Sequence, residues 1–136
     1  FTEMENILLQ NNQLEGALPS CLTSLPALEE LDVHNNNLSG PIPPGFLTIP
    51  TLEVLTLSNN NFSGSLDPLF EGGENFPAFG TLKTLNLHDN DFDGNVPEEL
   101  YFLNKLETLT LHGNSLTGNM LCENVVPMQM MTVDCE

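Results

Sequence analysis

One pattern of about 24 residues recurs along this chain, and it constrains the fold more than any other feature. Its clearest copy reads Leu28-x-x-Leu31-x-Val33-x-x-Asn36-x-Leu38-x-Gly40. The asparagine recurs at the same place in each of five copies, as Asn12, Asn36, Asn60, Asn90 and Asn114. A fixed period of this length predicts a solenoid, because no repeat can bury its apolar face except against its neighbours.

The whole chain, 1–136, is expected to form a single domain of five repeats and the start of a sixth. The approximate boundaries are 4–27, 28–51, 52–81, 82–105, 106–129 and 130–136. The third repeat is longer because six residues are inserted within 71–78, where Gly-Gly and Pro indicate a loop. A neutral insertion and a partner-contacting loop both stay open. Neither end carries an obvious polar cap, so we expect this sequence to be part of a longer protein.

Alternating apolar and polar residues open each copy, as in a short strand that is buried on one face. Leu31 and Val33 are expected to point inward, and the residues between them to face solvent. The same phase predicts a solvent-facing set of candidate ligand-binding residues: Glu30, Asp32, His34, Val54, Thr56, Ser58, Thr84, Asn86, His88, Thr108, Thr110 and His112. A less certain first copy adds Asn6, Leu8 and Gln10.

An asparagine closes each strand where the chain turns away. Its side-chain amide has two donor hydrogens and an acceptor oxygen, so it can satisfy backbone groups that a buried turn leaves without partners. We therefore predict a structural asparagine ladder made of Asn12, Asn36, Asn60, Asn90 and Asn114.

These residues resemble the leucine-rich repeat family, and a Gly-x-Ile-Pro segment such as Gly40-Pro41-Ile42-Pro43 marks its plant-type subclass. The resemblance implies an α/β, β-rich solenoid: a right-handed superhelix with a parallel concave sheet of about six short strands. The convex side would hold 3₁₀ or short helical turns and loops. Similar proteins are ectodomains of receptor-like proteins of plants and algae, or secreted inhibitors of wall-degrading enzymes.

The chain is strongly acidic, with two basic residues, nineteen acidic residues and a formal net charge of −17. Nucleic acids and anionic membranes both require a cationic face, so neither is an expected partner of this segment. A basic partner or divalent cations would be attracted. No run of 18 apolar residues is present to predict a transmembrane helix.

All three histidines fall in one column of the repeat, and His88 and His112 should lie about 5 Å apart on adjacent strands. Two imidazoles without a clear third ligand make a poor zinc site, so we predict no metal and no cofactor. A solvent-facing polar column is the preferred interpretation, and a pH-sensitive contact surface stays open. Residues 89–96 also mimic an EF-hand loop, but Leu100 stands where the bidentate Glu belongs. Loose divalent binding by its aspartates stays open.

No catalytic motif is present: the sequence has no Gly-x-Ser-x-Gly, no phosphate-binding glycine loop and no His-Glu-x-x-His. We therefore predict that the chain is not an enzyme. Two sequons at Asn37 and Asn61 are candidate N-glycosylation sites, although the repeat pattern also generates them by chance.

Three cysteines stand at 21, 122 and 135. Cys21 would lie four coils from Cys122, about 19 Å at the spacing of a sheet, which is too far for a disulfide. It is interpreted as a small buried apolar residue. The family resemblance implies the start of a cysteine-stabilised cap, with Cys122 bonded to Cys135. Alternatively, Cys135 pairs with a cysteine beyond Glu136.

The predicted function is recognition of a protein, a peptide or a glycan by the concave sheet of an extracellular or cell-surface protein. One alternative is an extracellular structural or protective protein, or an inhibitor, that binds a wall polymer, mineral or ice. A second alternative is an intracellular scaffold. Nothing in the pattern indicates an oligomeric state.

Overall fold

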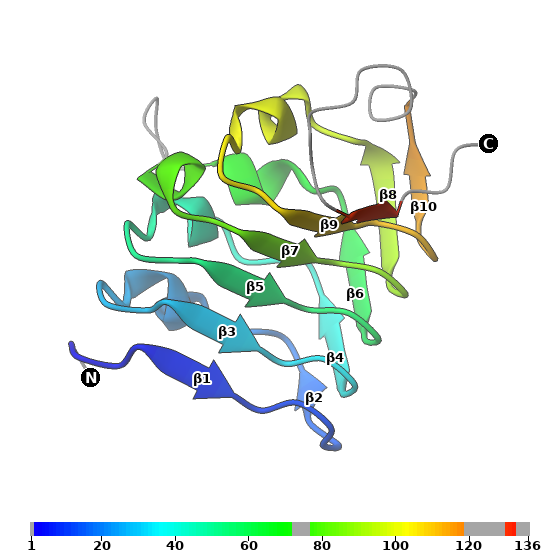
Figure 1. Cartoon of the computed structure of the whole chain (residues 1–136). Helices are drawn as coiled ribbons and strands as arrows, with labels where there is room; N and C mark the ends of the chain where they lie inside the picture. The colour runs from blue at the N-terminus through cyan, green and yellow to red at the C-terminus, as the bar shows by residue number, and fades with distance from the viewer. Residues whose placement is uncertain (1, 72–76, 119–129, 133–136) are drawn as a thin grey trace.

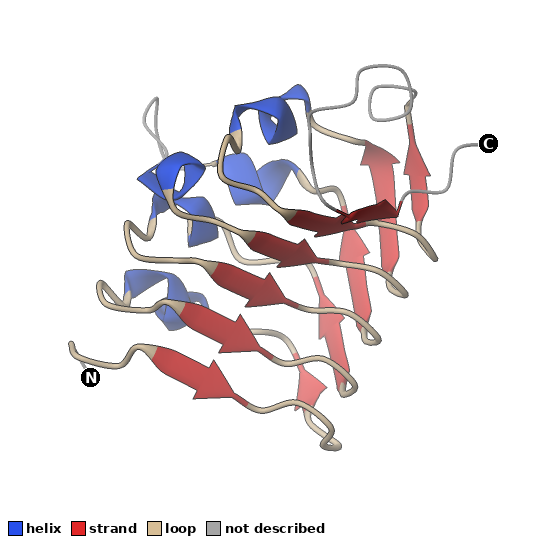
Figure 2. Cartoon of the chain, viewed as in Figure 1, coloured by secondary structure: helices blue, strands red, loops and turns tan. Residues whose placement is uncertain are grey.

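The computed structural model describes residues 2–71, 77–118 and 130–132, and these form a stack of similar coils (Figure 1). Each coil runs through a strand of one sheet, a strand of a second sheet and, where the structure describes it, a 3₁₀ helix. In Figure 2 the sheets form two separate columns of arrows, and the helices gather where each coil returns to the first sheet. The predicted leucine-rich-repeat type of solenoid is confirmed.

The first sheet has six strands, all parallel, and they lie side by side in chain order. They are β1 (Asn6–Leu8), β3 (Glu30–Asp32), β5 (Val54–Thr56), β7 (Thr84–Asn86), β9 (Thr108–Thr110) and β11 (Met130–Thr132). The repeat sets the register directly, because Leu31 pairs with Leu55, and Leu85 pairs with both Leu55 and Leu109. These four leucines have no exposed surface and form a continuous ladder in the core. Full burial of a leucine contributes about 1.5–3 kcal/mol.

A second parallel sheet, which the sequence did not predict, covers another side of the coils. Its strands are β2 (Glu15–Gly16), β4 (Asn37–Gly40), β6 (Asn61–Gly64), β8 (Asp91–Asn95) and β10 (Ser115–Thr117). Phe62 and Phe92, from neighbouring strands of this sheet, bury their rings in a stack with centroids 6.3 Å apart. Offset stacking of this kind adds to the apolar burial of the two rings.

In the described part of the chain, five short 3₁₀ helices lie on the remaining side, as expected for the convex face. They are η1 (Ser20–Ser24), η2 (Phe46–Thr48), η3 (Asp67–Phe70), η4 (Pro77–Gly80) and η5 (Glu98–Phe102). Pro19 and Pro97 stand immediately before η1 and η5, where an extended residue begins the turn. Among the described residues, no helix has the length and hydropathy of a membrane-spanning segment.

Cys21 is exposed, so its interpretation as a buried residue is wrong. In a 3₁₀ helix the residues i and i+3 share one face. Leu22 and Leu25 pack partly against the core, and Cys21 of η1, one residue earlier, therefore turns outward. The position of Cys21 relative to Leu22 and Leu25 therefore determines its exposure, although a cysteine side chain is hydrophobic enough to be buried.

Candidate functional site

The outer face of the six-stranded sheet gathers the predicted contact residues into columns. Because the strands pair without slippage, each column takes one residue from each neighbouring coil. The first column holds Glu30, Val54, Thr84 and Thr108, and the second holds Asp32, Thr56, Asn86 and Thr110. The third holds His34, Ser58, His88 and His112, just beyond the strands. We call these three columns the sheet face.

Three residues of the sheet face are buried: Thr56, Ser58 and Thr110 keep 8%, 3% and 5% of their surface. The expectation that all twelve face solvent is wrong for these three. Their side chains are short, and each has at least one longer side chain beside it in its column: Asn86 lies beside both threonines, and His34 and His88 lie beside Ser58. Thr110 also donates its hydroxyl to Oδ1 of Asn86 at 3.1 Å. The accessible members are Glu30, Asp32, His34, Val54, Thr84, Asn86, His88, Thr108 and His112.

His34 and Asp32 form a fixed pair at the acidic end of the sheet face. Nδ1 of His34 lies 2.7 Å from Oδ1 of Asp32, and the same oxygen accepts the backbone N–H of His34 at 3.0 Å. The two side chains keep 29% and 15% of their surface. The carboxylate therefore orients the imidazole while both groups remain accessible to a partner.

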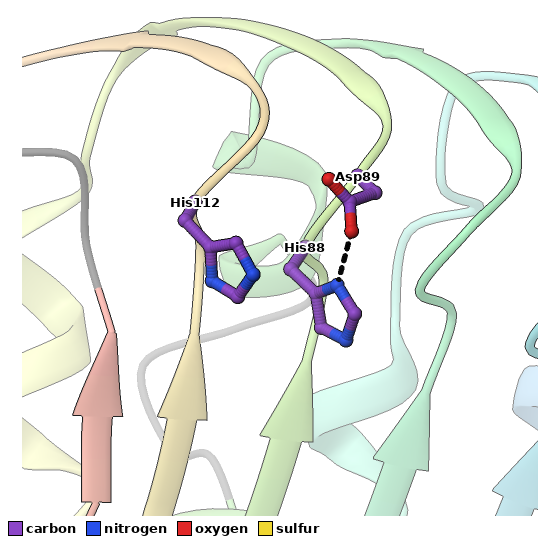
Figure 3. A group of neighbouring side chains, drawn as sticks. All are labelled: His88, Asp89 and His112. Atoms are coloured by element: carbon purple, nitrogen blue, oxygen red, sulfur yellow. Dashed lines mark hydrogen bonds and ion pairs between the residues drawn. The ribbon is translucent and has the colours of Figure 1, made fainter.

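At the other end, His88 and His112 stack ring on ring, with centroids 4.6 Å apart and planes 7° from parallel (Figure 3). Nδ1 of His88 also lies 2.8 Å from Oδ2 of Asp89. One donor atom from each of these three residues lies within 4.8 Å of the others. We call this group the His–Asp–His cluster.

Sequence reasoning missed Asp89 as a member of this cluster, because adjacent residues of a strand point to opposite faces. Asp89 is not in strand conformation: its φ is +53°, in the left-handed region, and this turns its side chain back toward His88. Asn11, Asn35 and Asn59 adopt the same conformation at the same place in their coils. The signal in the sequence was therefore a carboxylate at a position that the first three coils fill with asparagine.

Gly113 follows His112 in the next coil and gives the Asp89 carboxylate its room. A side-chain carbon on Gly113 would clash with Oδ1 of Asp89. Asn35 stands at this place three coils earlier, and it instead donates its amide to the side-chain oxygen of Asn11 at 2.8 Å. The pair Asp89 and Gly113 is thus a local replacement of an asparagine–asparagine contact.

The ladder asparagines lie directly behind this face, where the chain leaves the first sheet. Asn60 donates its amide to the carbonyls of Val33, Leu57 and Ser58 at 3.0, 3.1 and 3.2 Å. Its oxygen accepts the backbone N–H of Leu38 at 3.0 Å. Equivalent sets surround Asn36, Asn90 and Asn114, and the first copy has the two donor bonds of Asn12.

An acidic column precedes the strands of the six-stranded sheet: Glu5, Glu29, Glu53 and Glu107, interrupted by Lys83. Nζ of Lys83 lies 2.6 Å from Oε2 of Glu53. This hydrogen bond raises the pKa of Lys83 above 10.5, and the charges of Glu53, Glu107 and Glu29 act in the same direction. Four carboxylates against one cation give this edge of the sheet a negative potential next to the sheet face.

Two family models match this sequence. One, described as "Leucine rich repeat", matches residues 2–63, and the other, "Leucine Rich Repeat", matches residues 81–103. The chain belongs to the leucine-rich repeat family. No curated protein matched the sequence of this leucine-rich repeat chain.

Solved structures of plant receptor ectodomains share this leucine-rich repeat fold. The ectodomain of the receptor kinase SOBIR1 from Arabidopsis thaliana is 30% identical, with a TM-score of 0.72 over 82% of this chain and 57% of that one. The Arabidopsis receptor kinase HAESA was solved with the peptide hormone IDA and the co-receptor SERK1. It is 30% identical, with a TM-score of 0.75 over 85% of this chain and 18% of that one. A chain of the BIR3–SERK2 complex from Arabidopsis thaliana is 37% identical, with a TM-score of 0.71 over 82% of this chain and 57% of that one. The leucine-rich repeat chain thus spans less than two thirds of each of them.

The remaining candidate sites of the leucine-rich repeat chain divide by location. Asn37 and Asn61 are exposed on β4 and β6 of the second sheet. Cys122 and Cys135 lie outside the described residues, as does most of the insertion within 71–78. Their predicted disulfide and loop roles stay predictions.

Proposed function

We propose that this chain is a non-catalytic recognition module that binds a peptide or protein on the sheet face, within a cell-surface or secreted protein. The observation that supports this function is the alignment of accessible polar side chains in three columns, two within regularly paired strands and the third just beyond them. A surface built on strands loses little conformational entropy when a partner binds. The similarity to HAESA, which was solved with a peptide hormone, supports a peptide as the partner.

The charge of the surface defines the partner further. Glu30 and Asp32 of the sheet face lie beside the acidic column that contains Glu29 and Glu53. The net charge of the whole chain is −17. A peptide with basic residues would be attracted to this end, and its association rate would fall as salt is added.

A threonine face for a polymer, mineral or ice receives less support. Such a surface needs the same side chain exposed in the same column of every coil. Thr56 and Thr110 are buried, and Asp32 and Asn86 share their column. The structure therefore favours a surface of different side chains, which suits recognition of a specific partner.

A selection from a displayed random-peptide library tests the proposal, with two matched variants of the chain. Asn86→Arg places a cation on the sheet face, and Asn95→Arg places one on the second sheet. The two asparagines are matched, because each accepts a threonine hydroxyl from the next coil, from Thr110 at 3.1 Å and Thr117 at 2.9 Å. We expect basic peptides that bind the unmodified chain and the Asn95 variant, and bind the Asn86 variant at least tenfold more weakly. Equal binding to both variants would refute the sheet face as the binding surface.

A further inference from the structure

We propose that His88, Asp89 and His112 form a binding site for a divalent transition metal ion, with Zn²⁺ as the expected ion. The three donor atoms lie within 4.8 Å of one another at the end of β7 and β9 (Figure 3). This site revises the sequence-based expectation, which counted only two imidazoles and therefore no metal. It needs no peptide partner to form, so its test is independent of the recognition function proposed above.

The donor set selects the class of ion. Two imidazole nitrogens and one carboxylate oxygen suit zinc and its neighbours in the transition series, which protein sites often hold with three side chains. Calcium and magnesium require a shell of oxygen ligands, and this cluster offers a single carboxylate. A bound ion would have at least one coordination position left for water or for a donor atom of another molecule.

The backbone under the cluster is fixed by hydrogen bonds between the two coils. The N–H of Asp89 donates to the carbonyl of His112 at 2.9 Å, and the N–H of Asn90 donates to that of Gly113 at 3.2 Å. Zinc holds nitrogen and oxygen ligands at about 2.0–2.2 Å, so two donors on one ion lie at most about 4.4 Å apart. Donors within 4.8 Å therefore need only small side-chain rotations, and these side chains are partly exposed.

Three features of this site are not required by the repeat. The repeat does not require histidines in two adjacent coils at this position, because Ser58 holds the same position in the coil before His88. The left-handed residue after that column is asparagine in the first three coils, and only Asp89 supplies a carboxylate there. Gly113 lacks the side chain that would clash with that carboxylate. All three features meet between the same two coils.

The chain contains its own control for this site. His34 and Asp32 make the same kind of contact, with Nδ1 at 2.7 Å from Oδ1. The coil after His34 has Ser58 at the position that His112 holds in the coil after His88. The His34–Asp32 pair therefore has one imidazole and one carboxylate. If the second imidazole matters, zinc should distinguish the two places.

Calorimetric titration of the full 136-residue chain with Zn²⁺ tests the proposal, with the three cysteines alkylated because thiolates also bind zinc. We expect one ion per chain. The variants H88A and H112A should each weaken binding at least tenfold, D89N should weaken it several-fold, and H34A should change it less than twofold. Circular dichroism melting of each variant shows whether the fold is retained.

A second readout uses the unmodified sequence and therefore does not depend on a variant that folds. The chain has three histidines, so the imidazole C–H signals in an NMR spectrum are few. One equivalent of Zn²⁺ should shift the ring signals of His88 and His112 and leave those of His34 unchanged. The proposal would be overturned by zinc binding that H88A and H112A do not weaken, by equal shifts at all three rings, or by displacement of zinc by equimolar Ca²⁺. Each of these results would indicate loose attraction to the acidic surface.

Discussion

The side-chain oxygen of Asn60 accepts a hydrogen bond of 3.0 Å from the backbone N–H of Leu38, which lies in the adjacent coil. The amide of the same asparagine donates to carbonyls of its own coil and of the preceding one. A single buried side chain thus ties the end of one strand in the first sheet to the beginning of a strand in the second. Aspartate has the same shape but cannot donate, and this explains the chemistry required at the position.

Replacing Asn60 with alanine should reduce the free energy of unfolding by about 1–3 kcal/mol, because buried backbone groups lose their partners. Asn60→Asp should cost more, since it also places a carboxylate beside three carbonyl oxygens. Asn61→Ala is the matched control, because Asn61 is exposed one residue later. Chemical denaturation gives all three values. An unchanged midpoint for Asn60→Ala would show that the ladder does not stabilise this chain.

The first sheet could be predicted because two signals agree there. Alternation sets which side of each strand is buried, and the 24-residue period sets the register, so Leu31 and Leu55 meet without further information. The second sheet gives neither signal. A strand such as β4 contains one buried side chain, Leu38, and ends at Gly40, whose φ is +84°. A four-residue segment with one apolar residue and a final glycine cannot be distinguished from a turn by its sequence.

Replacing Lys83 with glutamine should lower the melting temperature at low salt, because it leaves the acidic column without its only cation. The pKa of Lys83 is raised in the folded chain, so its contribution is fully present below pH 10.5 and is lost as the pH rises through the folded pKa. The difference between the two proteins should therefore vanish in strongly alkaline buffer, and shrink in high salt at neutral pH. Lys105→Gln removes the same charge elsewhere. Equal effects of the two variants would argue against a specific role of the column.

Replacing Phe92 with alanine should destabilise the chain by about 3–5 kcal/mol, the usual cost of removing a buried aromatic ring. The Phe92 ring has no exposed surface and stacks on Phe62. Phe102→Ala is the control, because that ring keeps 62% of its surface and contacts Phe79 from outside. We expect it to cost at most about 1.5 kcal/mol. Thermal and urea unfolding compare the two, and similar losses would contradict the packing of the second sheet.

The predicted contact surface needed information that a strand pattern does not contain. Whether Thr56 or Ser58 reaches solvent depends on the length of the side chains in the neighbouring coils, so alternation gives their direction without their exposure. Asp89 required knowledge of its backbone conformation, because a φ of +53° reverses the direction expected of a residue next to His88. The 24-residue period predicts which residues form a column. The His–Asp–His cluster depends on Asp89, where this coil departs from the asparagine of the first three coils.

Expression in a eukaryotic secretory host should add glycans at Asn37 and Asn61, because both side chains are exposed. The variants Ser39→Ala and Ser63→Ala destroy the two sequons and keep the asparagines, so each should remove the mass of one glycan. Intact-mass spectrometry measures this directly. Secreted protein without any added mass would contradict this prediction and remove the support that the two sequons give to an extracellular location.

Replacing Gly113 with alanine should cost about 1–2 kcal/mol, because its φ of +66° lies in the left-handed region that disfavours a side chain. The new methyl group would also displace the Asp89 carboxylate. Gly113→Asn should cost less, since asparagine tolerates this conformation and occupies it at Asn35 and Asn59. Gly80→Ala is the control, because an added carbon there meets no atom within 4 Å. If Gly113→Asn were as costly as Gly113→Ala in urea denaturation, the clash with Asp89 would outweigh the backbone conformation.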